Sequence, residues 1–458
     1  MGYDVFLLVS RNENTHDIVT ESLCKLIQQR YGYNYQLINT VDDIDYICTP
    51  VSSVRYASSK EGEIFDSAKK WYIENEKASY KFKKVLKAKY FRVSASTNEN
   101  SATLLWQGRL MLSISKLEAF AKCPFAFFLQ YGLKLKERNV YDFNIMDRGT
   151  LTHSFMEEFT NYVIDNNIDW YKITKKDIDD IFEKMDKNGI KDLTEKMPCA
   201  TSRHQFLTEK LTQTAKNALS AVVKQVQAGS FVPFTTELDL SADERVTPIK
   251  LKTPSGLEIT LTGKIDRVDR FENEYRIVDY KSSAKELKLG EVYNGTMLQL
   301  FVYSNALKEF FGQSKGMFYF GVVPDVSDVK NLGEETGINI KNYKLNGYLV
   351  GDDDVYTQMD KNLSGRSSDI FNKNNKLLFT DYEALSKKVF EHIENYSEKI
   401  SKGHFDIEPI LTENTDGCSY CSFKSVCGFD VSVGKYRECE KLSKDDVLRK
   451  IREEAENG

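Results

Sequence analysis

The 458-residue sequence contains no apolar run that approaches the roughly 18 residues needed to cross a bilayer. An early apolar segment, residues 5–9, is too short for the core of a signal peptide and has no basic flank before it. Cysteine is also sparse, because eight cysteines in this length are too few for a secreted disulfide scaffold. We therefore expect a soluble protein that works in the cytosol, without a membrane partner.

The sequence also lacks a G-x-x-x-x-G-K-[ST] motif, so we expect no P-loop motor, and it has no internal repeat. Its 63 Lys and Arg against 68 Asp and Glu give a net charge of −5, which argues against a general binder of polyanions. That charge is an average over several expected domains, so it does not exclude nucleic acid. With 41% hydrophobic residues, the chain has enough apolar material for sizeable cores and is not a disordered protein.

Residues 1–110 are expected to form a separate region, with a β-α segment and a long basic helix. Residues 1–50 alternate short apolar runs with an amphipathic stretch, which predicts a βαβ-like unit. Residues 60–92 predict a long helix that bears ten Lys or Arg and five Asp or Glu. This helix is either an ordinary solvated amphipathic helix or a strip that faces nucleic acid.

Residues 111–440 are expected to form the main domain, followed by a charged helix within 441–458. A helix begins after Ser113 or Ser115, where Glu118 would complete a capping box with Ser115, and a nearby proline predicts a break. The stretch 325–376, rich in Asn, Asp, Gly and Lys, predicts a loop-rich insertion. The other patterns predict helices at about 149–164, 174–228, 293–311 and 380–402, and strands at 234–240, 258–271, 274–281 and 316–323.

Two carboxylates and a lysine form the most informative pattern. The polar stretch 271–274 predicts a four-residue hairpin turn, and a symmetric hairpin places Asp266 directly opposite Asp279. Like charges opposed across strands are destabilising unless a cation such as Mg²⁺, which prefers carboxylate oxygens, lies between them. Lys281 follows on the same strand face as Asp279. The alternative is an exposed hairpin with scattered charges, but the apolar neighbours of Asp279 indicate burial, where an unpaired carboxylate is costly.

Three residues on the predicted helices extend this pattern. His153 lies off the apolar stripe of its helix, and a neutral imidazole beside two carboxylates is a suitable metal ligand. Gln299 and Tyr303 are four residues apart, so they share a helix face and could present polar groups to one ligand. The alternatives are a histidine satisfied within the fold and ordinary polar residues on a helix surface.

The order of these motifs resembles a known family. A helix with G-x-L-x-H, a G-K-I-D-R-V-D strand, a V-D-Y-K strand, a Q-L-x-x-Y helix and a further strand are similar to the RecB-type branch of the PD-(D/E)XK nucleases. The resemblance implies an α/β fold with a restriction-endonuclease-like α-β-β-β-α-β core, over about 149–165 and 234–323, with helical insertions. It also implies a metal-dependent deoxyribonuclease.

The resemblance implies a set of metal ligands. His153, Asp266, Asp279 and the backbone carbonyl of Tyr280 would hold Mg²⁺ or Mn²⁺, which would lower the pKa of a bound water. Glu237, at the start of the first core strand, is a further candidate, although it could equally be a surface carboxylate on an edge strand.

The resemblance also implies catalytic roles for Lys281, Gln299 and Tyr303, beside the two aspartates. Lys281 would orient the attacking water or neutralise charge on the phosphate. Gln299 and Tyr303 would position the substrate backbone or support the metal ligands.

A cluster of cysteines follows the predicted core. Cys418, Cys421 and Cys427 have the spacing C-x2-C-x5-C, and three thiolates leave one coordination position open. Cys123 is the natural fourth ligand, and Cys439 is its competitor. In a reducing compartment such a cluster favours metal over disulfides, and C-x2-C by itself favours structural zinc.

The same family contains an iron–sulfur subgroup with one cysteine before the nuclease core and three after it. This sequence resembles that subgroup, including K-C-P-F-x-F-F around Cys123. The resemblance implies a [4Fe–4S] cluster on Cys123, Cys418, Cys421 and Cys427, which would staple the two ends of the nuclease domain. Structural Zn²⁺ is the alternative.

Within this subgroup the sequence is most similar to the C-terminal nuclease region of the AddB family, the nuclease-bearing subunits of AddAB helicase–nucleases that process DNA double-strand breaks. AddB proteins are much longer, which implies a fragment or a truncated homologue, and the resemblance implies that residues 1–110 are a remnant of the end of their helicase-like portion. The resemblance implies DNA as a partner, with a single strand at the nuclease site and exonucleolytic cutting, and an AddA-like subunit that carries the motor. The alternative is a DNA-end-binding or scaffold module whose nuclease site is inactive or needs a partner.

Overall fold

A computed structural model describes residue 74 and residues 110–136, 145–185, 202–253, 258–323, 340–361, 368–412, 416–431 and 434–457. The chain divides into two compact units, Met1–Val93 and Ser94–Gly458. All described residues except residue 74 lie in the second unit, to which the following description applies. Our predictions for 1–50 and for the basic helix at 60–92 therefore lie outside the described residues.

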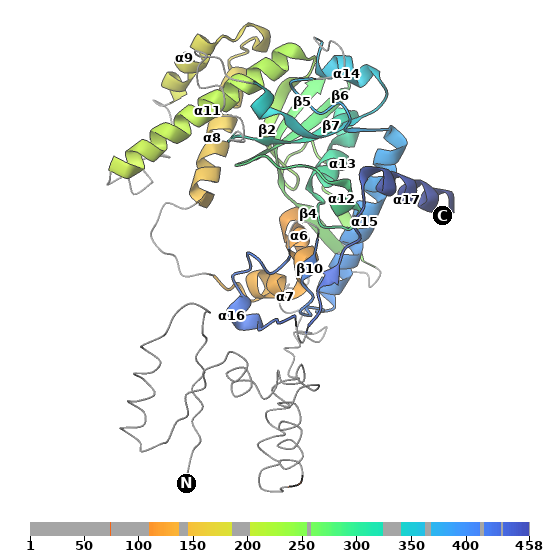
Figure 1. Cartoon of the computed structure of the whole chain (residues 1–458). Coiled ribbons are helices and arrows are strands. Elements are labelled where there is room, and N and C mark those ends of the chain that lie inside the picture. Colours follow the sequence, from red (N-terminus) through yellow and green to blue (C-terminus); the bar gives the residue numbers. More distant parts are fainter. Residues whose placement is uncertain are drawn as a thin grey trace, which may run out of the picture. The chain divides into compact units, whose positions relative to one another are not determined.

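The main sheet has six strands in the order β2-β5-β6-β7-β8-β9 (Figure 1). The β2–β5, β5–β6 and β7–β8 pairs are antiparallel, whereas β6–β7 and β8–β9 are parallel. Because parallel neighbours need a crossover, the chain between β6 and β7 forms helices α12 and α13. The strands are β2 (Val232–Asp239), β5 (Lys264–Phe271), β6 (Glu274–Lys281), β7 (Gln313–Gly321), β8 (Leu345–Val350) and β9 (Lys376–Leu377).

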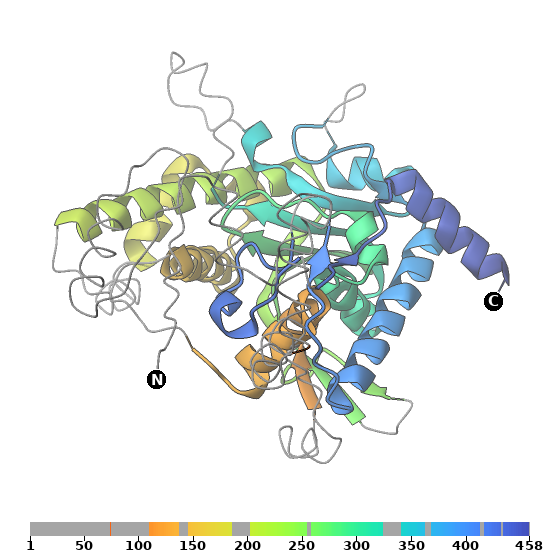
Figure 2. The same cartoon turned by 60° about the horizontal axis from the view of Figure 1, so that its bottom comes forward.

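Helices cover both faces of this sheet (Figures 1 and 2). Val278 and Tyr280 of β6 pack into one hydrophobic core with α8, α9 and α11. Side chains alternate along a strand, so Tyr275 and Asp279 face the other side, where both hydrogen-bond to α13. The helices are α8 (Ile145–Asp165), α9 (Lys175–Met185), α11 (Ser202–Ala228), α12 (Leu289–Tyr293), α13 (Gln299–Phe311), α14 (Asp354–Met359) and α15 (Phe379–Ser401), with the short turns η3 (Trp170–Lys172) and η6 (Ile340–Tyr343).

Two smaller sheets complete this unit, and the first of them joins its beginning to a later part. In the first, of order β1-β4-β3, β1 runs parallel to β4, and in the second β10 runs parallel to β11. The elements involved and their neighbours are β1 (Leu110–Ser113), α6 (Ile114–Lys122), α7 (Pro124–Phe127), η2 (Phe128–Gly132), β3 (Lys250–Lys252), β4 (Glu258–Thr262), β10 (Ile410–Leu411), α16 (Lys424–Cys427), β11 (Arg437–Glu438) and α17 (Lys444–Asn457).

The predicted core is present as α8, β2, β5, β6, α13 and β7, which is the order α-β-β-β-α-β. The expected strand 258–271 is broken at Gly263 into β4 and β5, which belong to different sheets. A Cβ atom at Gly263 would lie 2.9 Å from the hydroxyl oxygen of Tyr303, so the break brings the backbone against that side chain. The expected helix 293–311 is present as α13, which begins later, at Gln299, because α12 ends at Tyr293. Across the described part of the chain, no helix is both long and apolar enough to span a membrane.

The described parts of 325–376 are more regular than predicted, because β8 and β9 extend the main sheet. The β5–β6 hairpin has the predicted register, with Arg267 opposite Val278 and Phe271 opposite Glu274. Its turn is shorter than the predicted four residues, because Phe271 and Glu274 are still paired.

Candidate active site

Asp266 and Asp279 lie side by side at the end of the β5–β6 hairpin. Continuing the observed register by one residue beyond the Arg267–Val278 pair places the two aspartates opposite each other. Their side chains are only 12% and 3% exposed. The carboxylate of Asp266 accepts a hydrogen bond from the backbone N–H of Tyr280, at 2.6 Å, which fixes it against β6. Two adjacent, buried carboxylates are costly without compensating cations.

Lys281, Gln299 and Tyr303 surround Asp279 in one connected network. The ammonium of Lys281 forms an ion pair with one carboxylate oxygen of Asp279, and Gln299 Nε2 donates to the other at 2.7 Å. Gln299 also accepts from Lys281 at 3.4 Å and donates to the hydroxyl of Tyr303 at 3.3 Å. The structure therefore brings together the predicted acid and lysine of β6 and the predicted polar residues of α13.

His153 and Glu237 approach Asp266. One potential ligand atom from each of these three residues lies within 4.8 Å of those of the other two, and His153 Nδ1 is 3.6 Å from Asp266 Oδ2. Glu237, for which a ligand and a surface carboxylate were equally expected, has φ +46° in β2. A left-handed conformation is strained for a non-glycine residue, and such strain is concentrated at functional sites. No feature of the local sequence indicates this strain.

Burial dominates the electrostatics of this group. It raises the pKa of Asp266 well above its ordinary value, and the neighbouring charge of Asp279 adds to the effect. Burial lowers the pKa of His153, so the imidazole is neutral near pH 7 and able to offer a lone pair. A neutral imidazole and carboxylate oxygens at this spacing suit a divalent cation, whose charge would offset the crowded carboxylates.

Comparisons with known proteins agree with this geometry. The sequence profile described as "PD-(D/E)XK nuclease superfamily" matches residues 111–428. The chain belongs to the PD-(D/E)XK nuclease superfamily. It is 30% identical over 92% of its length to the B subunit of the ATP-dependent helicase/deoxyribonuclease of Alkaliphilus metalliredigens, and 31% identical over 83% to that of Clostridium kluyveri. It spans 40% and 36% of the lengths of these relatives.

Helix α6 contacts the candidate site of this PD-(D/E)XK core through Glu118. Of the two predicted N-caps of α6, Ser113 is confirmed, because its hydroxyl accepts from the backbone N–H of Lys116 at 3.3 Å. The predicted capping box between Ser115 and Glu118 is wrong. Glu118 instead reaches α13. One of its carboxylate oxygens accepts the backbone N–H groups of Leu298, at 2.8 Å, and Gln299, at 3.1 Å. It thereby caps the helix that carries Gln299.

A buried cluster of charges, which sequence reasoning missed, lies on β5 and β6 next to the candidate site. Arg267, Asp269 and Arg276 are all 0% exposed, and Asp269 is within 2.8 Å of a nitrogen of each arginine. Arg267 also donates to the hydroxyl of Tyr280 at 3.1 Å. The cluster carries one more positive than negative charge, and burial lowers the pKa of Arg276. Charged residues within otherwise apolar strands were the available sequence signal.

The four predicted cluster ligands surround one cavity of about 340 Å³, lined by Cys123, Cys418, Cys421 and Cys427. Cys123 is buried at the start of α7, and burial raises the pKa of its thiol. No three of the four sulfur atoms lie within 4.8 Å of one another. Cys439, the competing ligand, does not line this cavity.

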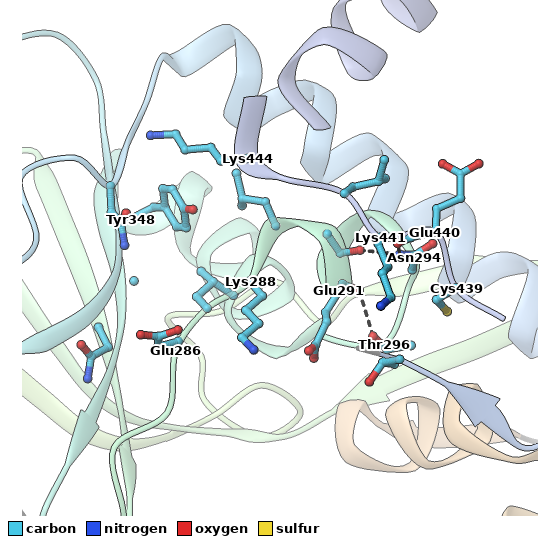
Figure 3. A pocket seen from close by; sticks show the side chains of 18 of the residues that line it. Glu286, Lys288, Glu291, Asn294, Thr296, Tyr348, Cys439, Glu440, Lys441 and Lys444 are labelled. Carbon is cyan, nitrogen blue, oxygen red and sulfur yellow. Dashed lines mark hydrogen bonds between the residues drawn. The ribbon is translucent and has the colours of Figure 1, made fainter. Parts of the chain in front are cut away.

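Cys439 lines a different cavity of about 370 Å³, between α12, β8 and the segment before α17 (Figure 3). Asn294 and Thr296 in its wall are bound to backbone carbonyls of Glu440 and Glu291. The cavity mixes lysines with carboxylates, and its hydrogen bonds tie the C-terminal segment to α12. It holds none of the predicted nuclease residues.

Proposed function

We propose that this chain is the nuclease module of a two-subunit helicase–nuclease that processes broken DNA. In this proposal it hydrolyses phosphodiester bonds of single-stranded DNA, exonucleolytically and with a divalent metal. The observation that carries the proposal is the convergence of His153, Glu237 and Asp266 with the network around Asp279 and Lys281, inside a PD-(D/E)XK core.

The residues fit a hard divalent cation such as Mg²⁺ or Mn²⁺. His153, Asp266, Asp279 and the carbonyl of Tyr280 would hold it, with Glu237 as a further ligand. The support is the donor set itself, together with the pKa of Asp266, which burial and Asp279 raise and which a cation would lower again. When bound, such a metal supplies an activated water and stabilises charge that develops on the phosphate.

The chain's own residues would orient the reacting groups. Lys281 would place its ammonium against the phosphate, where its charge opposes the negative charge that accumulates during hydrolysis. Gln299 holds both Asp279 and Lys281 and would keep this pair in one orientation. Tyr303 supports Gln299 and would limit its rotation.

For the cysteine cavity we propose a [4Fe–4S] cluster. Four thiolates on one zinc ion would lie about 3.8 Å apart, given Zn–S bonds near 2.3 Å. No three of these sulfurs all lie within 4.8 Å of one another, and the cavity of about 340 Å³ that they line leaves room for a larger group. Iron and sulfide analysis of anaerobically purified protein tests this, and stoichiometric zinc in place of iron would refute it.

A motor-bearing, AddA-like partner is part of the proposal. The relatives are named as one lettered subunit, the B subunit, of an ATP-dependent helicase/deoxyribonuclease, and this sequence has no P-loop motif. Such a partner would feed single-stranded DNA to a chain whose net charge of −5 gives little attraction for DNA.

Cleavage of a labelled single-stranded oligonucleotide in Mg²⁺ or Mn²⁺ tests the proposed function. We expect Asp279→Asn and Lys281→Met each to reduce the rate at least a hundredfold, because both remove charge at the reacting centre. Lys308→Met, which removes an exposed lysine paired with Glu383, is the matched control and should retain activity. Equal activity in all variants would refute the site. DNA binding by a metal-replete wild type without cleavage would favour the scaffold alternative.

A further inference from the structure

The chain after β6 turns back over the end of β7 and returns a second lysine to the nuclease site. The N–H groups of Val322 and Val323 donate to the carbonyls of Lys281, at 2.8 Å, and Ser282, at 3.2 Å. A Cβ atom at Gly321 would lie 2.8 Å from the backbone nitrogen of Ala284. Because Gly321 has no side chain, the segment that contains Ala284 can cross close to the end of β7. This crossing directs Lys285, the residue after Ala284, back over the sheet.

Lys285 and Lys281 converge on the same aromatic ring. The ammonium of Lys285 lies 4.4 Å from the ring centroid of Tyr319, and that of Lys281 lies 5.4 Å from it. Tyr319 pairs in register with Asp279 across β6 and β7, so its ring is the direct neighbour of the proposed metal-binding carboxylate. The hydroxyl of Tyr319 is buried and has no hydrogen-bond partner among the described residues. Two ammonium groups thus stand beside one ring at the edge of the site.

Lys285 differs from Lys281 in forming no direct ion pair. Lys281 is paired with Asp279, whereas no carboxylate among the described residues lies within 4.0 Å of the Lys285 ammonium. The side chain is only partly exposed, and burial lowers its pKa. The carboxylates of Glu118 and Asp279, which are near but form no ion pair with it, oppose this shift, and the charge of Lys281 adds to it. A cation–π contact compensates part of the lost hydration, but a desolvated ammonium is most favourably completed by an anion.

We propose that Lys285 binds a backbone phosphate of the DNA strand next to the phosphate that is cut. This inference rests on the proposed function and adds a substrate-positioning residue to it. Lys281 lies against Asp279 at the proposed metal site, so it would serve the scissile phosphate. Lys285, which has no ion-pair partner, would hold the neighbouring phosphate. The contact would exist equally before and during hydrolysis, so it would contribute to binding of the strand and not to the chemical step.

The test compares Lys285→Met, which keeps an apolar stem over Tyr319, with Lys285→Arg, which keeps the charge. In the full chain we expect Lys285→Met to raise KM for a single-stranded oligonucleotide about tenfold with kcat unchanged. The slope of log affinity against log salt should fall by about 0.7, the value for one phosphate contact on a single strand. Lys285→Arg should restore both values, and Lys308→Met should match the wild type.

Binding is measured separately in an Asp279→Asn background, so that loss of cutting does not obscure it. Wild-type cleavage with an unchanged KM and salt slope in Lys285→Met would overturn the role of Lys285 alone. A folded wild-type chain that neither binds nor cuts the oligonucleotide would overturn both proposals. A lower kcat at constant KM would also overturn a role in strand binding. If Lys285→Met does not fold, Lys285→Gln takes its place in every comparison.

Discussion

The carboxylate of Glu118 on α6 caps α13, the helix that bears Gln299. We therefore expect substitutions of Glu118 to lower both the free energy of unfolding and the rate of cleavage. Glu118→Ala would leave the backbone N–H groups of Leu298 and Gln299 without their acceptor. Loss of a cap costs about 0.5–2 kcal/mol, and charge-assisted hydrogen bonds contribute about 1.5–3 kcal/mol, so we expect a loss of about 2–3 kcal/mol in the free energy of unfolding. Glu118→Gln keeps an acceptor and should lose about 0.3–1 kcal/mol, the value of a negative charge at a helix N-terminus.

The same substitution should affect cleavage. The first turn of α13 would fray, and Gln299 would lose its fixed position against Asp279 and Lys281. A displacement of about 1 Å can cost a hundredfold in rate, so we expect Glu118→Ala to lower kcat by ten- to a hundredfold with KM nearly unchanged. Urea denaturation and steady-state kinetics measure the two effects. Glu383→Ala, which removes an exposed ion pair of the same helix, should change neither by much. A destabilised Glu118→Ala variant with wild-type kcat would refute the positioning role.

Three further predictions concern charge and metal. Without metal, the raised pKa of Asp266 means that its carboxylate destabilises the fold most above that pKa. This penalty decreases as the pH falls below the raised pKa and vanishes at the ordinary pKa of an aspartate. The increase in Tm on adding Mg²⁺ should therefore shrink as the pH is lowered from neutral, and Asp266→Asn should abolish it. Asp269→Asn should cost about 3–5 kcal/mol in urea denaturation, because it leaves two buried arginines without their carboxylate, and a loss below about 1 kcal/mol would contradict this. Cys123→Ser should lose bound iron and have a lower Tm than the wild type, whereas Cys439→Ser should keep the iron content and the Tm of the wild type. Loss of iron in Cys439→Ser but not in Cys123→Ser would make Cys439 the fourth ligand.

Local patterns predicted the parts of this fold that depend on neighbours in sequence. The register of the β5–β6 hairpin follows from symmetry about a short turn, so the opposition of Asp266 and Asp279 could be inferred although the turn length was wrong. Glu118 could not be assigned in the same way, because its partners on α13 lie 180 and 181 residues away. A capping box involves only residues close in sequence. Here the carboxylate of Glu118 instead accepts two backbone N–H groups of a distant helix, which a local pattern does not indicate.

The remaining differences have similar physical causes. Gly263 lies between β4 and β5, where Tyr303 occupies the space that a side chain would need. Sequence spacing does not reveal this contact. The buried cluster around Asp269 resembles an ordinary alternation of charges along a strand until tertiary packing removes water from both arginines. Strand β8 lies in a stretch whose polar composition indicated loops, but its residues are stabilised by pairing with β7.

The cysteine cavity also sets an order of events during synthesis. Its first wall contains Cys123, and the other three thiols begin 295 positions later, at Cys418. At about 5–20 residues per second, a ribosome needs roughly 15 s to 1 min to make the intervening chain. Whatever group the cavity holds can therefore be enclosed only after the whole nuclease core has been translated. A group that needs all four cysteines would therefore bind late in the synthesis of the chain. Its presence would indicate that the whole nuclease core has been made.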